Sequence, residues 1–335
     1  MYLNIVTGNN ELFWKYWRDL SKTIDYQHPI YSRVGLEFYK EYFFGGEVVT
    51  DMSFIIVKDD VAMIGIILSI ELNNSGIRLS GYGRGIPYIE NNKGNISGIK
   101  SARKIFRKKF DSIVAEKQIK SILFRDYMST DGNLSVLARQ ILDMGGIPQI
   151  IYLQLIDLLK PVEEIHSDLS KSCRNGVSWG RKNLEVNHFN SVTITADKIE
   201  QLRQLHIMES GRETRSKKSW ENLFNIVKND NGFIIEGRLS GELITSSLFM
   251  FNQNICLYSV SATSRSFFNK PIGHAVMWEA INYAKSLGCR YFDFGGLSYN
   301  SNNNCVSEKE MNINRFKKSF GGRTKIQLSI DWNTK

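Results

Sequence analysis

The two halves of this 335-residue chain repeat one order of apolar and polar segments, and this repeat constrains the fold more than any other feature. Two apolar runs joined by a short polar turn open the pattern in each half: residues 54–60 with 61–68, and 233–236 with 242–249. Each pair predicts a β-hairpin, because the runs have the length of strands and the turns contain Asp or Ser-Gly. A further strand is expected after each hairpin, over 77–82 and 255–262.

A helix and a buried strand follow in the same order in both halves. The helices are predicted over 98–116 and 273–287, and they lead into apolar strands over 121–125 and 290–294. The order hairpin, strand, helix, strand resembles the GNAT core, although two unrelated α/β halves could share it by chance. We expect an α/β (α+β) fold of two tandem GNAT-like domains, each a mixed, mainly antiparallel sheet flanked by helices.

The boundary between the two domains is expected near Pro161, after a strand over 149–158. Proline cannot continue a strand and disfavours helix at the residue before it, which suits a linker. The N-terminal domain would then cover 1–158 and the C-terminal catalytic domain 159–335. Because the loop over 90–98 is rich in Asn, we expect the first half to have lost its carrier site.

The composition favours a soluble, cytoplasmic protein. Apolar residues make up 42% of the chain and charged residues 23%, and the N-terminus lacks the pattern of a signal peptide. The longest apolar run, over 61–70, is about half as long as a membrane-spanning helix, so no membrane span is expected. The four cysteines lie far apart without nearby histidines, which argues against a metal site and a disulfide framework.

The net charge of +9 indicates an anionic partner, or else solvated helix faces on a basic protein. Binding to DNA is disfavoured, because no basic segment shows a helix-turn-helix or finger pattern. Arg212 and Arg215, followed by Lys217 and Lys218, form one basic cluster. That cluster would suit the diphosphate of a nucleotide sugar, and a solvated face is the alternative.

A loop over 264–275 joins a predicted strand to a helix and is the candidate carrier-binding site. Gly273 near the helix start would let the backbone approach a phosphate, which the free N–H groups of the helix would hold. Arg265 and Lys270 add positive charge, and His274 and Ala275 complete the loop. The alternative is a plain Pro-Gly turn.

Two further residues could carry chemistry. Asp293 lies in an aromatic strand that ends at a Gly-Gly bend, and a buried Asp must be paired. It would accept a proton from an amine or orient it, or else cap the turn. Lys317 lies beside Phe316 and Phe320, which are spaced to share one helix face, and a partly desolvated lysine could stabilise an oxyanion. Phe316 is a candidate substrate-binding residue, and the alternative is that both rings belong to the core.

Chained motifs over 271–281, 291–297 and 316–322 resemble the FemA/FemB-type proteins, and the resemblance covers most of 170–325. It implies tandem GNAT-like domains. Some members take aminoacyl groups from tRNA to build peptidoglycan bridges, and others take acyl groups from coenzyme A to modify amino sugars. By motif match, the resemblance assigns oxyanion stabilisation to Lys317 of the Phe316-Lys317 pair. It also assigns nucleotide-phosphate binding to Arg212.

We therefore predict an N-acyltransferase that uses a coenzyme A thioester as co-substrate, without a metal. The acceptor would be the amine of a nucleotide-linked amino sugar for bacterial surface polysaccharide, attacking the thioester directly. One alternative is an aminoacyl-tRNA-dependent transferase that adds an amino acid to a peptidoglycan precursor. Another is a non-catalytic protein that binds nucleotide sugars or coenzyme A. The sequence leaves the oligomeric state open.

Overall fold

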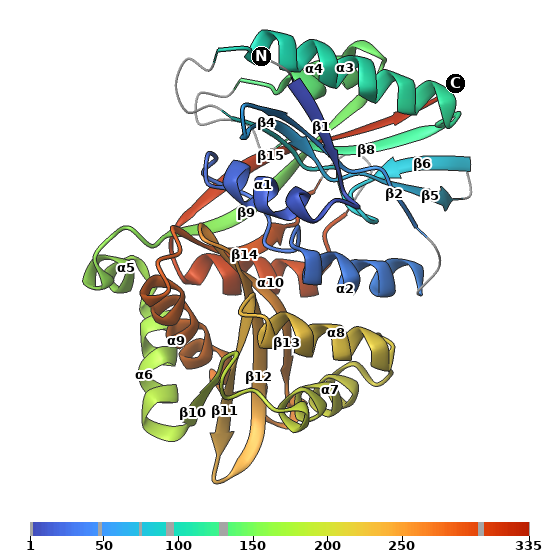
Figure 1. Ribbon diagram of the computed structural model, residues 1–335. Coiled ribbons are helices and arrows are strands. Elements are labelled where there is room, and N and C mark those ends of the chain that lie inside the picture. Colours follow the sequence, from blue (N-terminus) through green and yellow to red (C-terminus); the bar gives the residue numbers. More distant parts are fainter. Residues whose placement is uncertain are drawn as a thin grey trace. The chain divides into compact units, whose positions relative to one another are not determined.

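A computed structural model describes residues 3–45, 49–73, 76–91, 97–126, 133–300 and 305–334. The chain divides into two compact units (Figure 1), which we describe separately. Unit 1 comprises Met1–Gln27, Tyr31–Ile151 and Gln327–Lys335, and unit 2 comprises His28–Ile30 and Tyr152–Ile326. This division differs from the expected one at residue 158. Residues 152–157 belong to unit 2 because they pair with its strand β14, and the segment from Gln327 belongs to unit 1 because it pairs with β8.

Unit 1 contains two sheets. The first is antiparallel in the order β1-β3-β4-β7, with bounds Leu3–Thr7, Phe54–Lys58, Val61–Ile66 and Tyr88–Glu90. The second contains β2, β5, β6, β8 and the end of β15, with bounds Thr50–Asp51, Ser69–Asn73, Gly76–Ser80, Ser121–Asp126 and Arg323–Asn333. The helices are α1 (Glu11–Ser21), α2 (Arg33–Phe44), α3 (Ile99–Glu116) and α4 (Val136–Asp143).

The first unit departs from the expected arrangement at one point. The strand predicted over 61–68 ends at Ile66, and the chain then passes into the second sheet through β5. The Leu68 amide donates a hydrogen bond at 3.0 Å to the Ser53 hydroxyl instead of continuing the ladder. The hairpin β3–β4 and the following strand β6 therefore lie in different sheets.

The core of unit 1 explains why α3 forms where it was predicted. Its apolar residues Ala102, Phe106, Phe110 and Ile113 recur at helical spacing, and all four are buried. They pack with Phe54 and other apolar residues of the sheets in one continuous cluster.

Unit 2 contains one sheet in the order β10-β11-β12-β13-β14, extended by the 152–157 part of β9 (Ile147–Asp157). The other bounds are Glu185–Phe189, Gly232–Leu239, Glu242–Phe251, Ile255–Thr263 and Tyr291–Leu297. Six α-helices and a short 3-10 helix, η1, belong to the described residues of this unit. They are α5 (Val162–Asp168), α6 (Lys171–Asn183), α7 (Ala196–Ser210), α8 (Lys217–Lys228), η1 (Arg265–Phe267), α9 (Ile272–Ser286) and α10 (Glu308–Ser319).

The strands β13 and β14 are parallel neighbours that pair only at their start. Their register runs from Ile255↔Tyr291 to Leu257↔Asp293 and then stops. An irregularity in β13 follows at once, where Leu248 faces Val260 but Phe249 faces Tyr258. Beyond Leu257, therefore, the edge of β13 is not paired with β14. The short parallel pairing leaves backbone groups on this edge available for other contacts.

Candidate functional site

The helix α10 brings Lys317 to the bend of β14. The helix starts with a reciprocal capping box between Ser307 and Glu310. Near its end, the Lys317 Nζ donates a hydrogen bond at 2.6 Å to the carbonyl oxygen of Gly296. Burial lowers the pKa of Lys317, and the negative charge of Asp293 opposes this shift. The structure thus places a partly desolvated ammonium group just beyond the point where β13 and β14 separate.

Asp293 is buried and holds this bend in shape. Its Oδ1 accepts a hydrogen bond at 2.6 Å from the amide of Gly295, which has a φ of +79°. Glycine adopts this left-handed conformation without steric cost. This hydrogen bond is the one expected if Asp293 caps the turn. Asp293 also acts electrostatically on Lys317, as the pKa of that residue indicates.

The candidate carrier loop leads into α9, whose N-terminus has no side-chain cap. Pro271 occupies the cap position, and its side chain has no oxygen that could accept a hydrogen bond from a helix amide. Arg265 and Lys270 are exposed beside it, and the Lys270 Nζ lies 6.0 Å from the ring centre of Trp179. A Cβ added at Gly273 would lie 3.7 Å from the Phe316 ring, an ordinary contact. The protein itself therefore does not require glycine at position 273.

The two other residues predicted in this loop face the packing of unit 2. His274 stacks on Phe320 with ring centres 5.8 Å apart and contacts Phe316 edge-on at 5.3 Å. Burial lowers its pKa, which favours the neutral form. Ala275 is fully buried, and a Cβ added at Gly180 of α6 would lie 2.4 Å from it. His274 and Ala275 thus hold α9 in place, whereas Arg265, Lys270 and Gly273 line its start.

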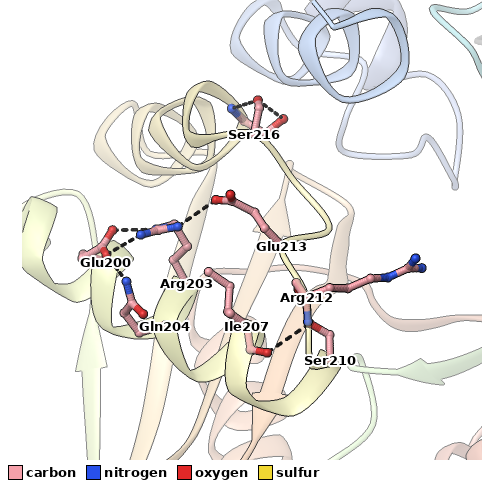
Figure 2. A network of polar contacts seen from close by, with 9 residues as sticks. Glu200, Arg203, Gln204, Ile207, Ser210, Arg212, Glu213 and Ser216 are labelled. Carbon is pink, nitrogen blue, oxygen red and sulfur yellow. Dashed lines mark hydrogen bonds and ion pairs between the residues drawn. The ribbon is translucent and has the colours of Figure 1, made fainter.

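The two arginines of the predicted basic cluster differ in their surroundings. Figure 2 shows the Arg212 side chain extending away from the network in which Arg203 pairs with Glu200 and Glu213. Within the described part of the chain, its guanidinium has no ion pair or hydrogen bond. Arg215, by contrast, lies 2.9 Å from His206 Nε2. Its guanidinium also lies over a tryptophan ring of α8. The exposed Arg212 can contact a ligand, whereas Arg215 packs the segment between α7 and α8 against these two helices.

The sequence reasoning missed a polar group on β12 and β13. The hydroxyls of Ser247 and Ser261 lie 2.9 Å apart across the two strands. Burial raises the pKa of Tyr258, while its hydrogen bond with Ser261 opposes that shift. Glu209 of α7 accepts a hydrogen bond at 2.9 Å from the amide of Thr263. The alternation of hydroxyl residues within apolar strands was the signal that could have revealed this group.

No protein-family model and no curated protein matches this chain. Solved structures do. FemX superposes with a TM-score of 0.73 at 12% identity, covering 100% of this chain and 98% of that one. A tandem GNAT protein from the clavulanic acid biosynthesis pathway gives 0.54 at 11% identity, covering 99% and 98%. L-PGS from Bacillus licheniformis gives 0.54 at 12% identity, covering 84% and 83%.

This chain has the tandem GNAT fold. The tandem GNAT fold that we expected from the internal repeat and from the Fem-type resemblance is thereby confirmed. Among the described residues, no cluster of three or more His, Cys, Asp and Glu side chains could hold a metal ion. Within the same part of the chain, no helix is both long and apolar enough to cross a membrane.

Proposed function

We propose that this protein is a GNAT-type N-acyltransferase that transfers an acyl group from a phosphate-bearing carrier to an amine. The observation that carries the proposal is the position of Lys317. Its ammonium group is partly desolvated and fixed by Gly296 where β14 bends away from the unpaired edge of β13. A positive charge held in such a place stabilises negative charge that develops on a carbonyl oxygen.

In the proposed reaction the neutral amine attacks the carrier's carbonyl carbon. A C–N bond forms, the tetrahedral oxyanion collapses, and the bond from carbon to the carrier's sulfur or oxygen breaks. Lys317 would stabilise the oxyanion, together with a backbone N–H on the edge of β13 beyond Leu257. The amine's proton would pass to water. We assign Asp293 to positioning, because its Oδ1 is bound to the Gly295 amide and its charge acts on Lys317.

For the donor we propose acyl-coenzyme A, bound by its pyrophosphate at the start of α9. The positive end of the α9 dipole, together with Lys270 and Arg265, is suited to a phosphate. The amides of Ile272 and His274 already donate to the carbonyl oxygens of Lys270 and Pro271, so they are not counted among its donors. For the acceptor we propose a nucleotide-linked amino sugar for surface polysaccharide. The unpaired guanidinium of Arg212 would bind its diphosphate.

A second candidate is aminoacyl transfer from tRNA to a peptidoglycan precursor. The observation that favours it is the superposition with FemX over the whole of both chains, at a TM-score well above that of the other tandem GNAT protein. The Fem-type motifs of the sequence point the same way. Under this alternative Lys317 has the same role, and the carrier's phosphates belong to the tRNA.

Transfer assays with the purified full chain test both candidates. Acyl-coenzyme A with UDP- and dTDP-linked amino sugars is compared with aminoacyl-tRNA and a UDP-linked peptidoglycan precursor. We expect N-acylated sugar from the first pair. Product from the tRNA pair alone would show that the donor is aminoacyl-tRNA and the acceptor a peptidoglycan precursor. Binding of these ligands without transfer in either assay would favour a non-catalytic role.

Two neighbouring lysines provide a matched test of mechanism. Lys317→Met should lower kcat by about 10²-fold, as loss of an oxyanion-hole donor does. Lys318→Met removes the same charge from an exposed side chain that lies over Tyr299, and it should leave kcat nearly unchanged. Equal effects of the two substitutions, or a loss at Lys317 that follows unfolding, would remove Lys317 from the reaction.

A further inference from the structure

A strained turn in unit 1 holds an arginine in a fixed position. The turn is Gly81–Arg84, closed by a hydrogen bond of 2.6 Å from the Gly81 amide to the Arg84 carbonyl oxygen. Tyr82 has a φ of +57°, which is an outlier for an aromatic residue. The buried ring of Tyr82 and hydrogen bonds from the turn to Ser69 and Ser80 hold this conformation.

The turn is also pressed against its neighbours on both sides. A Cβ at Gly83 would lie 2.7 Å from the ring of Phe43, and a Cβ at Gly85 would lie 2.6 Å from Arg125 Cβ. The Ile86 amide donates to a carbonyl oxygen of β8, and the Arg125 amide donates back to the Ile86 carbonyl oxygen at 3.3 Å. This packing brings Arg84 close to Arg125.

Arg84 lies over the ring of Tyr39, and Arg125 acts on the same residue by its charge. The Arg84 guanidinium lies 5.2 Å from the ring centre of Tyr39 and 5.7 Å from that of Phe43. Burial raises the pKa of Tyr39, and the positive charges of both Arg84 and Arg125 oppose this shift. Both charges therefore act on one phenol group.

Apart from the rings of Tyr39 and Phe43 beside Arg84, the described residues give neither guanidinium an ion-pair partner. The Nε atoms of Arg84 and Arg125 are buried and without a hydrogen-bond acceptor. No carboxylate in the described ranges pairs with either side chain. Two like charges near each other repel, and a buried donor without an acceptor destabilises the fold. An anion bound between the two guanidinium groups would offset their repulsion.

We propose that Arg84 and Arg125 form a binding site in unit 1 for the phosphate group of a ligand, with the Tyr39 hydroxyl as a further donor. Two guanidinium groups match the charge and the oxygen geometry of a phosphate. Next to Arg84, the rings of Tyr42 and Phe43 are 41% and 40% exposed, and they offer a surface for a planar part of the same ligand. This site is distinct from Arg212 and Lys270, which belong to unit 2, and it does not depend on the proposed acyl transfer.

Isothermal titration of the full chain with inorganic pyrophosphate, and with inorganic phosphate, tests the site. Arg84→Gln and Arg125→Gln should each raise the pyrophosphate Kd by about tenfold or more, since each removes charge-assisted hydrogen bonds. Arg107→Gln removes the same charge from an exposed position on α3 and should leave the Kd unchanged. Arg84→Lys keeps the positive charge but loses the planar guanidinium, so its affinity for pyrophosphate should also fall. This variant tests the site if Arg84→Gln fails to fold.

A Lys270→Gln variant separates this site from the proposed carrier site. Pyrophosphate binding that is lost in the Arg84 and Arg125 variants but kept in Lys270→Gln supports the inference. Loss in Lys270→Gln alone would support the carrier site and overturn the inference. Equal affinity in all variants would also overturn it. Binding of polyglutamate without binding of pyrophosphate would overturn it in favour of an acidic protein partner.

Discussion

Replacing Gly273 with Ala should raise stability and weaken carrier binding, and these opposite signs make it a sharp test of the carrier loop. The added Cβ would lie 3.7 Å from the Phe316 ring, so the protein has room for it. Position 273 is the second residue of α9 and has no positive φ. Alanine in place of glycine in a helix stabilises by about 0.5–1 kcal/mol. The melting temperature should therefore rise by about 1–4 °C.

The same methyl group would occupy the space through which a phosphate approaches the first amides of α9. Losing one charge-assisted hydrogen bond costs about 1.5–3 kcal/mol, which corresponds to about a tenfold or greater rise in the Kd for coenzyme A. Isothermal titration gives the Kd, and a thermal melt of the same sample gives the stability. Unchanged affinity together with a higher melting temperature would refute the assignment.

Gly288 provides the control at the other end of the same helix. Its φ is +82°, so Gly288→Ala places a side chain in a left-handed conformation and should lower the melting temperature. No atom lies within 4 Å of the added Cβ, and the position is remote in sequence from the carrier loop. Affinity for coenzyme A should stay unchanged. A loss of affinity here would show that binding follows stability and not the local approach of a phosphate.

Three further predictions follow from the site. Arg212→Gln should raise the KM for a nucleotide-linked acceptor by about tenfold with little change in kcat, because the lost contact is to bound substrate; an unaltered KM in steady-state kinetics would contradict this. Gly180→Ala should destabilise the protein by about 1–3 kcal/mol, since its Cβ would overlap Ala275; a melting temperature equal to wild type would show that α6 and α9 can separate. Because burial lowers the pKa of Lys317, the folded protein loses this proton before the unfolded chain does, so the free energy of unfolding should rise with pH just below 10.5. Denaturant titrations should show this increment in wild type and not in Lys317→Met.

The elements with strong local signals could be predicted from the sequence. The helix α3 forms where apolar residues recur at helical spacing. The expected bend at Gly295 and Gly296 is an irregularity within β14, and the strand continues through it to Leu297 instead of ending there. Phe316 of α10 and Phe320, which directly follows the helix, contact each other with ring centres 5.2 Å apart. In each case residues within a few positions of one another decide the structure.

What the sequence did not reveal depends on contacts between distant residues. The sequence predicts one continuous strand over 61–68. In the structure the Leu68 amide donates a hydrogen bond to the Ser53 hydroxyl, and the chain passes into the second sheet. His274 was expected in the carrier loop, and it instead packs against the rings of Phe316 in α10 and of Phe320 just after it. Arg84 and Arg125 are forty-one positions apart, and only the packed turn shows that they share one environment.

The path of the chain through unit 1 has a consequence for biosynthesis. Strand β8 is synthesised early, but its antiparallel neighbour is the segment Leu328–Asn333 of β15. Unit 2, by contrast, is almost continuous from Tyr152 to Ile326. On the ribosome unit 1 therefore begins first and is completed last, contrary to the usual order in which N-terminal domains finish folding before later ones emerge. Until β15 arrives, one edge of β8 lacks its strand partner, so a chain stalled after unit 2 would expose an edge prone to pair with other chains.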